Sequence, residues 1–260
     1  MPEPTVRVRM GEDVRLETDL AYQSTPHCVF SLHLNAASET TIVGEAIKMF
    51  TGIIEELGDM HSIRSHGDGC RLKINAHTIL SDVSIGDSIS VNGCCLTVVE
   101  YENKSSDSWF AVDVVPESLS LTTMGKLAER EIVNLERSMS ANGRFGGHVV
   151  QGHVDAIAEV LHIHDHEDGS KRLTFNIPKD VSGQIVRKGS VALDGISLTV
   201  ASTNQEQGTF DIAVIPHTLE VTTLGKKIVG DQVNVEADLF ARYIAGIINS
   251  DSYVALKGKK

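Results

Sequence analysis

The chain carries the stretch Asn92-Gly-Cys-Cys-Leu-Thr-Val98, which returns 102 residues later as Asp194-Gly-Ile-Ser-Leu-Thr-Val200. Asn-Gly and Asp-Gly favour the two-residue turn of a β-hairpin, and the alternation of polar and apolar residues that follows is typical of a half-buried strand. Each stretch therefore predicts a turn followed by a β-strand. Their recurrence predicts that the chain contains one structural unit twice.

The repetition extends over most of the chain. At an offset of 100 residues the sequence aligns Gly52 with Gly152, Phe110 with Phe210, Pro116 with Pro216, Thr123 with Thr223, Asn134 with Asn234, and Glu136 with Glu236. The change between offsets of 100 and 102 indicates loops of different length in two copies of one domain. We place the copies at residues 49–148 and 149–238, after an extension at 1–48 and before segments at 239–250 and 251–260.

Both copies are rich in short strand patterns. Runs of branched and aromatic residues bounded by Gly, Asn and Asp occur at Ser88–Val91, Leu96–Val99, Trp109–Val115 and Ile132–Glu136. About six strands in so short a repeat favour a closed barrel, because closure removes exposed sheet edges. We predict an all-β fold of two tandem six-stranded Greek-key barrels, with a flat sandwich as the alternative.

The two ends of the chain differ from the repeats. Residues 1–48 lack a sustained periodicity and contain seven acidic residues, which argues against a secretory signal or a transit peptide, and we predict a poorly ordered extension. Residues 239–250 predict a C-terminal amphipathic helix that packs either on a partner subunit or on its own barrel. Its apolar stripe consists of Leu239, Phe240, Tyr243, Ile244, Ile247 and Ile248.

Composition excludes several classes of function. The chain holds 23 Lys and Arg residues against 35 Asp and Glu, and the formal net charge of −12 opposes binding to nucleic acid or to an anionic membrane surface. No apolar run approaches the ~20 residues of a membrane span. Four cysteines without a C-x-x-C pair favour a reducing compartment. We therefore expect a soluble, cytoplasmic protein that acts on a small molecule or on another protein.

The recurrent strands present candidate site residues on one face. Strand alternation separates the small polar residues from the apolar ones in both copies. The polar face carries Cys95 and Thr97 in the first copy and Ser197 and Thr199 in the second. The plain alternative is a half-exposed strand after a turn. Both copies keep the polar pair while the loops around it change, which favours a functional role.

Two further motifs carry polar groups. The stretch Gly146-Gly-His-Val-Val-Gln-Gly-His-Val-Asp155 spans the junction of the copies, where Gly152 permits close backbone approach and His153 offers an imidazole. Val114-Val-Pro-Glu-Ser-Leu119 and Val214-Ile-Pro-His-Thr-Leu219 place an extended backbone before proline. A structural role, as a glycine turn or a strand end, is the alternative in each case. The second copy adds charges that belong either to a site or to the surface: Lys188, Glu236 and Asp238.

A histidine-rich tract invites comparison with a metal site. In His162-Ile-His-Asp-His-Glu-Asp168 three histidines share one strand face. The tract adjoins the turn signal Asp168-Gly169 and lacks a remote fourth ligand, so a solvated hairpin tip is favoured. We assign no metal. The sequence also contains no P-loop, dinucleotide fingerprint or nucleophile elbow.

These motifs, in this order within a duplicated chain, resemble the riboflavin synthase family. The resemblance covers residues 49–250, begins with Met49-Phe-Thr-Gly-Ile-Ile-Glu55 and includes Ile215-Pro-His-Thr-Leu-Glu220. It implies a dismutation in which two molecules of 6,7-dimethyl-8-ribityllumazine exchange a four-carbon unit, giving riboflavin and 5-amino-6-(D-ribitylamino)uracil. Because the C7 methyl group of the lumazine is acidic, positioning and acid–base help would suffice, without a metal or redox cofactor.

The resemblance also implies one substrate pocket on each barrel. The first would be lined by Gly52, Ile53, Ile54, Cys95, Leu96, Thr97, Asp113, Val114, Val115, Pro116, Glu117 and Ser118. The second would be lined by Gly152, His153, Val154, Lys188, Ser197, Leu198, Thr199, Val214, Ile215, Pro216, His217, Thr218 and Leu219. The unequal residues of the two pockets would separate donor from acceptor.

Roles follow from the resemblance as hypotheses. His153 would assist proton transfer, and Asp194, Glu236 and Asp238 would fix the second site. A nucleophile that adds at C7 would be bound or activated by Ser88, Cys95, Ser197 and Thr199. Cys95 is expected to act as a polar contact, because no cation nearby in the sequence would lower the pKa of its thiol.

The resemblance further implies a homotrimer. The first barrel of one chain would face the second barrel of the next, the C-terminal helix would hold the trimer, and association with lumazine synthase is open. The alternatives are a non-catalytic antenna protein that holds lumazine or flavin, as in luminous bacteria, and a purely structural barrel protein. An antenna protein should have lost ligand residues in one copy, whereas both copies keep theirs, which favours the enzyme.

Overall fold

The structure is a computed structural model that describes residues 49–104, 107–140 and 142–248, together with the short strands β1 (Arg9–Met10) and β2 (Val14–Arg15). These two strands pair antiparallel in a unit of their own. The rest of the predicted extension 1–48, the end of the predicted helix at 249–250 and the predicted tail 251–260 lie outside the described residues.

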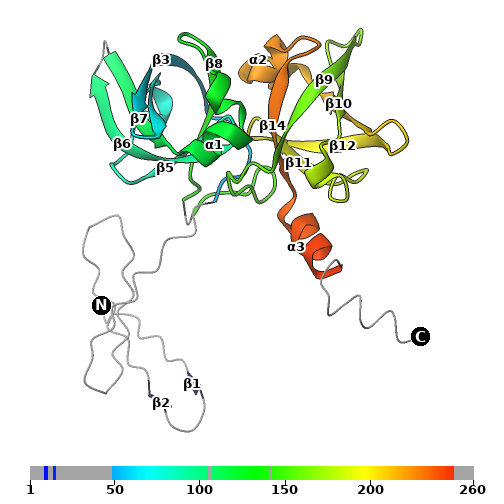
Figure 1. Cartoon of the computed structure of the whole chain (residues 1–260), viewed down its shortest axis with the longest axis horizontal. Coiled ribbons are helices and arrows are strands. Elements are labelled where there is room, and N and C mark those ends of the chain that lie inside the picture. The colour runs from blue at the N-terminus through cyan, green and yellow to red at the C-terminus, as the bar shows by residue number, and fades with distance from the viewer. Residues whose placement is uncertain (1–8, 11–13, 16–48, 105–106, 141, 249–260) are drawn as a thin grey trace. The chain divides into compact units, whose positions relative to one another are not determined.

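The first repeat is a closed antiparallel barrel (Figure 1). Its strands lie around the barrel in the order β3-β4-β7-β6-β5-β8. They are β3 (Glu56–His66), β4 (Gly69–Asn75), β5 (Ser88–Val91), β6 (Cys94–Lys104), β7 (Asp107–Val114) and β8 (Ile132–Arg137). The connections contain the 3-10 turns η1 (Thr78–Leu80) and η2 (Thr123–Lys126) and the helix α1 (Pro116–Leu121).

The second repeat builds the same barrel in the equivalent order β9-β10-β13-β12-β11-β14. Its strands are β9 (Ala156–Asp165), β10 (Lys171–Asn176), β11 (Ser190–Leu193), β12 (Ile196–Asn204), β13 (Thr209–Val214) and β14 (Gln232–Ala237). Its connections contain η3 (Lys179–Val181), α2 (Pro216–Val221) and η4 (Thr223–Lys226), and α3 (Leu239–Ile248) follows the barrel. The predicted pair of barrels is confirmed, and closure excludes the sandwich.

Both barrels are filled by their own side chains. Leu72 and Phe110 are fully buried in the first core, and Phe175 and Phe210 stack in the second with ring centroids 5.4 Å apart. An interior packed in this way holds side chains rather than a ligand. A binding site on either barrel therefore has to lie on its outer surface.

The turns predicted at the recurrent stretches are confirmed. Asn92 and Gly93 have φ values of 44° and 79°, and Asp194 and Gly195 have values of 45° and 80°, as a type I′ turn requires. The two turns meet, because a Cβ on Gly93 would lie 2.6 Å from the backbone nitrogen of Gly195. Glycine is thus needed both for the turn and for the contact between the barrels.

Two asparagines that align in the repeat join the barrels. Asn134 on β8 donates through Nδ2 to the carbonyl of Asp194 and to Oγ1 of Thr223, both at 2.9 Å. Asn234 on β14 donates to the carbonyl of Asn92 at 2.8 Å. Both asparagines are buried, so these bonds compensate for the loss of water around their amides. The contact between the barrels is therefore polar, and these hydrogen bonds fix which residues of the two barrels face each other.

Candidate functional site

The recurrent strands present their small polar residues outside the barrels, as their alternation predicts. In β6 Leu96 is buried in the core, whereas Cys95 is half-buried and Thr97 is exposed. In β12 Ser197 is half-buried and Thr199 is exposed. Each barrel thus offers one thiol or hydroxyl beside a second hydroxyl on its outer face.

A buried hydroxyl adjoins the first pair. Ser88 on β5 lies opposite Thr97 in the antiparallel register, and its side chain is buried. Among the described residues the Ser88 hydroxyl has no hydrogen-bond partner. Because buried hydroxyls are normally paired, this one retains the capacity to bond a ligand. Its repeat counterpart Ser190 lies opposite Thr199.

The segment that opens each repeat lies on the polar strand of the other repeat. The N–H of Cys95 donates to the carbonyl of Gly152 at 2.9 Å, and the N–H of Ser197 donates to the carbonyl of Gly52 at 2.8 Å. The approach leaves no room for a side chain, since a Cβ on Gly152 would lie 2.5 Å from Cβ of Cys95. Each polar strand is therefore covered by a segment from the opposite copy.

This exchange corrects the expected composition of the two pockets. We expected Gly52–Ile54 at the first pocket and Gly152–Val154 at the second. Instead Val154 packs against the core of the first barrel, and Ile54 packs against the core of the second. The two segments are exchanged because each one runs along the opposite barrel before the chain enters the strands of its own repeat.

A buried glutamate holds the segment that covers β6. Glu236 on β14 accepts hydrogen bonds from the N–H groups of Gln151, Gly152 and His153 at 2.7, 2.9 and 3.0 Å. Burial raises the pKa of Glu236 to about 7, against the lowering effect of its hydrogen bonds from the backbone. The residue belongs to the second barrel but fixes a segment at the first, so its expected place at the second site is also corrected.

Glu136 on β8 is the counterpart at the other pocket. It accepts from the N–H and the hydroxyl of Thr51 at 2.7 and 2.8 Å and from the N–H of Gly52 at 3.0 Å. Burial raises its pKa as well. Glu136 and Glu236, which align in the repeat, thus each hold one of the two exchanged segments by accepting hydrogen bonds from its backbone.

His148 is a site residue that the sequence reasoning missed. Its Nδ1 lies 2.7 Å from Oγ of Ser197. Burial lowers the pKa of His148, while the carboxylate of Asp238 acts in the opposite direction. The ring is therefore neutral at pH 7 and can accept the hydroxyl proton of Ser197 in a hydrogen bond. The sequence held a signal, because His148 stands in the same glycine-rich motif as His153.

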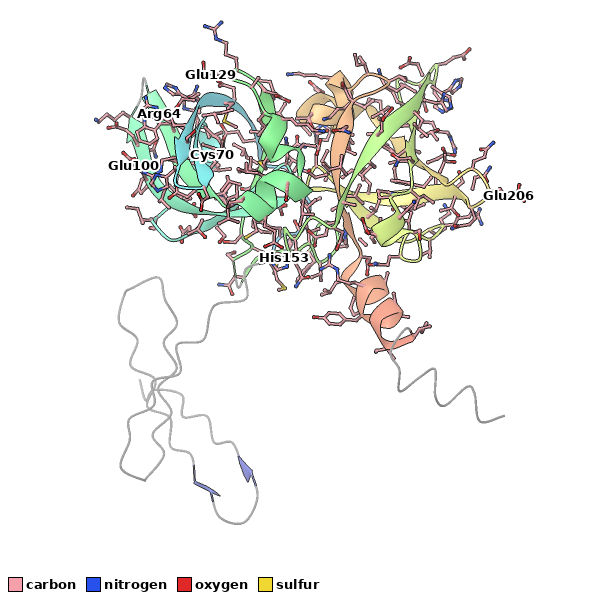
Figure 2. The ribbon with its side chains drawn as sticks, in the orientation of Figure 1. Arg64, Cys70, Glu100, Glu129, His153 and Glu206 are labelled. Atoms are coloured by element: carbon pink, nitrogen blue, oxygen red, sulfur yellow. The ribbon has the colours of Figure 1, made fainter. Side chains whose placement is uncertain are left out.

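His153 lies on the side of the barrels from which α3 leaves, and its imidazole is exposed (Figure 2). Its backbone is held firmly, since its carbonyl accepts from Nη2 of Arg242 at 3.3 Å. Asp238 stands between β14 and α3 and accepts from the N–H of Phe240 at 2.8 Å. Asp238 therefore both caps the helix and faces His148 at the second pocket.

Lys188 adopts a strained backbone beside β12. Its φ is 68°, a left-handed value that costs a non-glycine residue roughly 1–2 kcal/mol. Gly86 is its counterpart, because the N–H of Lys188 donates to the carbonyl of Val200 as that of Gly86 donates to Val98. The glycine of the first copy avoids this strain, which Lys188 retains in the second.

Four residues that we predicted at the pockets lie instead in a barrel core or in the contact between the two barrels. Leu96, Val114 and Val214 have buried side chains, so only their backbones can face a ligand. Asp194 is fully buried, and its carboxylate lies 3.1 Å from Nζ of Lys227. The predicted role of Asp194 at the second site is corrected, because the type I′ turn places it between the barrels.

The proline motifs form short helices at the same place on both barrels. Pro116 and Pro216 take the N1 position that proline favours. Val115 and Ile215 before them are extended, with 58% and 61% of their surface exposed. These apolar side chains suit a flat ligand or a facing protein surface. The other predicted residues of the motifs lie on the helices: Glu117, Ser118, His217, Thr218 and Leu219.

Two polar groups near the first pocket each have a fixed protonation state at neutral pH. Asp113 on β7 accepts from Nε and Nη2 of Arg71 at 2.7 and 2.8 Å, and this pairing lowers its pKa. Burial raises the pKa of Cys94 to about 12, so its side chain is a thiol at neutral pH. Neither group is therefore available as a base or nucleophile.

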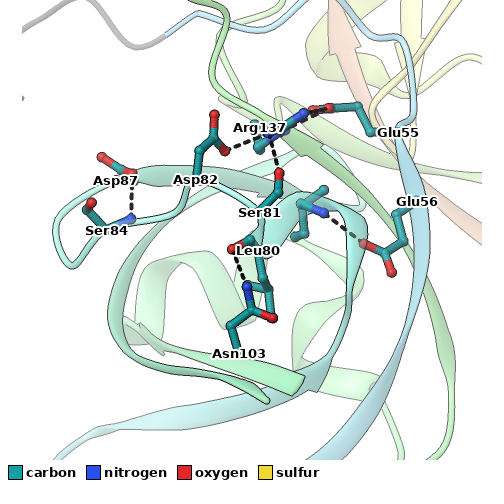
Figure 3. A network of polar contacts seen from close by, with 10 residues as sticks. Glu55, Glu56, Leu80, Ser81, Asp82, Ser84, Asp87, Asn103 and Arg137 are labelled. Carbon is teal, nitrogen blue, oxygen red and sulfur yellow. Dashed lines mark hydrogen bonds and ion pairs between the residues drawn. The ribbon is translucent and has the colours of Figure 1, made fainter. Parts of the chain in front are cut away.

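An arginine network fixes the loop that leads into β5. Arg137 at the end of β8 bonds Glu55 and Asp82 (Figure 3). Within the same loop Asp87 accepts from the N–H of Ser84 at 2.8 Å. Arg137 thus ties the start of the loop to β8, and the Asp87–Ser84 bond tightens the turn just before β5.

Helix α3 contacts its own barrel through polar groups and exposes its apolar stripe. Arg242 bonds Asp155 at 2.8 Å and Gln151 at 2.9 Å. None of the ten residues of α3 is buried, and Phe240 and Ile244 expose 69% and 57% of their surface. No helix among the described residues is long and apolar enough to cross a membrane.

The histidine-rich tract forms the predicted hairpin tip. Strand β9 ends at Asp165, and Asp168 accepts from the N–H of Ser170 at 2.9 Å. The rings of His164 and His166 lie 4.8 Å apart. In the part of the chain that the structure describes, no group of three His, Cys, Asp or Glu side chains is arranged to hold a metal ion.

Comparison with known proteins agrees with the duplicated architecture. The family model of the lumazine binding domain matches residues 51–138 and again residues 151–238. The riboflavin synthase of Actinobacillus pleuropneumoniae is 44% identical over 196 residues, which cover 75% of this chain and 88% of that protein. The riboflavin synthase of Bacillus subtilis is 43% identical over 198 residues, with the same coverage.

Solved structures show the same fold. The crystal structure of LumP complexed with 6,7-dimethyl-8-(1'-D-ribityl)lumazine matches with a TM-score of 0.63 and 28% identity. The LumP complex with riboflavin matches with a TM-score of 0.64. Both alignments cover 72% of this chain and 98% of LumP.

Proposed function

This chain belongs to the riboflavin synthase family, and from that membership we propose how its two barrels carry the reaction. The enzyme moves a four-carbon unit between two molecules of 6,7-dimethyl-8-ribityllumazine and forms riboflavin and 5-amino-6-(D-ribitylamino)uracil. The observation that carries this conclusion is the duplicated barrel with matched polar strands, because the reaction binds the same molecule twice.

Each pocket combines one barrel with the opening segment of the other. The first pocket is formed by Ser88, Cys95 and Thr97 with Gly152–Val154, and the helix α1 closes its edge. The second is formed by Ser197, Thr199 and Lys188 with Gly52–Ile54, and α2 closes its edge. The backbone bonds between Cys95 and Gly152 and between Ser197 and Gly52 support this assignment. Hydroxyl and amide groups there suit the polar edges of a pteridine ring and a ribityl chain.

The two pockets differ in the groups that matter for chemistry. The first has Cys95 and Gly86 where the second has Ser197 and Lys188. His153 belongs to the segment that covers the first pocket, where the other segment has Ile53. These differences support a division of labour in which one lumazine is the donor of the four-carbon unit and the other the acceptor.

Replacing Lys188 by glycine is expected to slow riboflavin formation at least tenfold without lowering stability. Glycine removes the backbone strain of roughly 1–2 kcal/mol from the folded state. This gain offsets the ~0.5–1 kcal/mol by which the greater conformational entropy of glycine stabilises the unfolded chain. The amine that we place at the second pocket is lost. Thermal unfolding and steady-state turnover, measured on the same preparation, test the prediction.

Arg130 provides a matched control. Its φ is 68°, and its repeat counterpart Gly230 has a φ of 94°. Arg130→Gly therefore relieves the same strain on a loop that carries none of the proposed pocket residues, and turnover should stay at the parental value. A Lys188→Gly enzyme with parental turnover would show that this lysine does not act in the pocket.

The exposed stripe on α3 supports a homotrimer in which the first pocket of one subunit faces the second pocket of the next. Two lumazines would then meet across the subunit boundary, as transfer between them requires. The exposed Val115 and Ile215 would lie at this boundary. A cytoplasmic location and an association with lumazine synthase stay predictions.

Purified, dialysed protein incubated with 6,7-dimethyl-8-ribityllumazine alone tests the function. We expect riboflavin and the pyrimidine in equal amounts by chromatography, with no added metal or nucleotide. Tight lumazine binding without turnover would instead assign the chain to the antenna class. The identity of 41–44% with riboflavin synthases supports the enzyme.

A further inference from the structure

An arginine on α3 holds the segment that covers the polar strand β6 at the first pocket. Nη1 of Arg242 donates to Oε1 of Gln151 at 2.9 Å. Nη2 donates to the carbonyl of His153 at 3.3 Å and to Oδ2 of Asp155 at 2.8 Å. Figure 2 shows His153 on the side of the barrels from which α3 leaves. One guanidinium group therefore bonds three residues of this short segment.

The other repeat holds its opening segment with an arginine of its own barrel. There the carboxylate of Glu55 accepts from the N–H of Arg137 at 2.7 Å and from Nε of the same residue at 3.0 Å. In the second repeat Asp155 likewise accepts from the N–H of Ala237 at 2.8 Å. Ala237 aligns with Arg137 but has no guanidinium group, and Arg242 supplies one from α3. The segment at the second pocket is thus bonded to a strand, whereas the segment at the first pocket is also bonded to the helix.

Arg242 also acts on the glutamate that holds the same segment. Burial raises the pKa of Glu236 to about 7, while hydrogen bonds from the backbone and the charge of Arg242 lower it and the charge of Asp155 raises it. Cys94 on β6 also interacts with Glu236, but burial raises the pKa of this thiol to about 12, so it is uncharged at neutral pH. A charged carboxylate accepts stronger hydrogen bonds than a neutral one. The arginine therefore supports the segment by its own bonds and by favouring the charged form of Glu236.

We propose that Arg242 is a positioning residue for the first pocket, so that the placement of Gly152–Val154 on β6 depends on the C-terminal helix. The inference rests on the proposed function, because it concerns a pocket for lumazine. Nε of Arg242 is buried and has no hydrogen-bond partner among the described residues. Since an unpaired buried donor costs free energy, the bonds to the segment have to outweigh that cost. The helix that carries the exposed apolar stripe thereby also fixes one of the two pockets.

The variant Arg242→Met removes the donors and the charge but keeps an unbranched side chain. We expect the mass in solution to stay that of the parent, because Phe240 and Ile244 are unchanged. Riboflavin should form about 30-fold more slowly, since the segment is no longer fixed at a site that works by positioning. Arg242→Lys keeps the charge near Glu236 but offers a single nitrogen, so its loss of rate should be about fivefold. Analytical ultracentrifugation and the riboflavin assay measure both properties.

Arg172→Met is the matched control. Arg172 on β10 bonds Asp211 on β13 at 3.4 Å, on the outer surface of the second barrel and outside both proposed pockets. Loss of this pair should leave the rate of riboflavin formation within twofold of the parent. A loss as large as that of Arg242→Met would show that the effect does not depend on the segment, and it would overturn the inference.

The pH profile supplies a readout that a merely structural role would not move. As the pH falls through about 7, Glu236 takes up a proton, its hydrogen bonds to the segment weaken, and the parental rate should fall. Without the charge of Arg242 the proton is taken up at a higher pH. The acid limb of Arg242→Met should therefore move up by about one pH unit, and that of Arg242→Lys should stay. In a Glu236→Gln background, Arg242→Met should leave the profile unmoved.

Hydrogen exchange of the backbone tests the structural step without the reaction. The N–H groups of Gly152 and His153 are bonded to Glu236, so they should exchange at least about tenfold faster in Arg242→Met than in the parent. The N–H of Gly52 is bonded to Glu136 at the other pocket and should keep its exchange rate, which provides an internal control. The comparison is valid whatever the mass of the variant in solution.

Three results would overturn the inference. The first is unchanged exchange at Gly152 and His153 in Arg242→Met, and the second is faster exchange there with the parental rate of riboflavin formation. The third is equally faster exchange at Gly52, which would indicate a general loosening of the protein. Failure of the proposed function looks different, because the parent would then form no riboflavin while the difference in exchange would persist.

Discussion

Replacing Gly152 by alanine is expected to lower the melting temperature by about 6 °C or more and to slow riboflavin formation about 100-fold. Gly152 has a φ of 76°, and an added Cβ would lie 2.5 Å from Cβ and 2.8 Å from the backbone nitrogen of Cys95. The left-handed backbone costs alanine roughly 1–2 kcal/mol, and the overlap costs roughly 1–3 kcal/mol more. About 3 kcal/mol corresponds to about 6–12 °C in a chain of this size.

The loss of rate has a separate cause. To relieve the overlap the segment has to move away from β6, which breaks the hydrogen bond from Cys95 to Gly152 and shifts His153 and Val154 relative to the first pocket. A displacement of about 1 Å at a site that works by positioning can cost about 100-fold in rate. Circular dichroism during heating and a riboflavin assay measure the two effects on one sample.

Gly67 is the matched control for Gly152. Its φ is 59°, and an added Cβ would have no heavy atom within 4 Å. Gly67→Ala therefore introduces the backbone strain without the overlap, and it should lower the melting temperature less and leave turnover intact. Equal behaviour of the two variants would show that the exchanged segment is not held against β6 as described.

Placing aspartate at both Phe240 and Ile244 is expected to convert the proposed trimer into monomers and to reduce riboflavin formation at least 100-fold. Both side chains are mostly exposed on α3, while Arg242 holds the helix to its own barrel. Charges within an apolar subunit contact are costly to desolvate, so the contact should be lost. Each monomer would keep both pockets but could no longer bring two bound lumazines together. Analytical ultracentrifugation and the product assay measure both consequences.

Ile228→Asp is the control for this pair of substitutions. Ile228 exposes 66% of its surface in the loop before β14, away from α3. The added charge should change neither the mass in solution nor the rate. A parent protein that sediments as a monomer and still forms riboflavin would contradict the trimer and the shared site.

Much of the fold was predictable because it rests on local patterns. The predicted strand Ser88–Val91 coincides with β5, and the predicted run Ile132–Glu136 differs from β8 by one residue at its end. Alternation in β6 correctly separated Leu96 from Cys95. Such patterns act over a few residues, through turn chemistry and side-chain burial, so they can be read without knowing what packs against the strand.

The candidate site was only partly predictable. The polar residues of β6 and β12 are outside the barrels as expected, but Asp194 is buried between the barrels and Glu236 serves the segment at the other copy. His148 was overlooked because its partner Ser197 lies 49 positions away. An alignment of the two copies pairs equivalent positions, and equivalent positions need not be neighbours in space.

The amino-acid pattern alone thus specifies two barrels, their turns and the outward face of each polar strand, because these depend on period-two burial and on glycine-containing turns. Tertiary packing specifies which segment covers which pocket. Gly152 lies on Cys95, and Gly52 lies on Ser197, because the barrels meet through Asn134 and Asn234. Contacts between distant segments depend on how two finished surfaces fit together, and no short-range pattern records that fit.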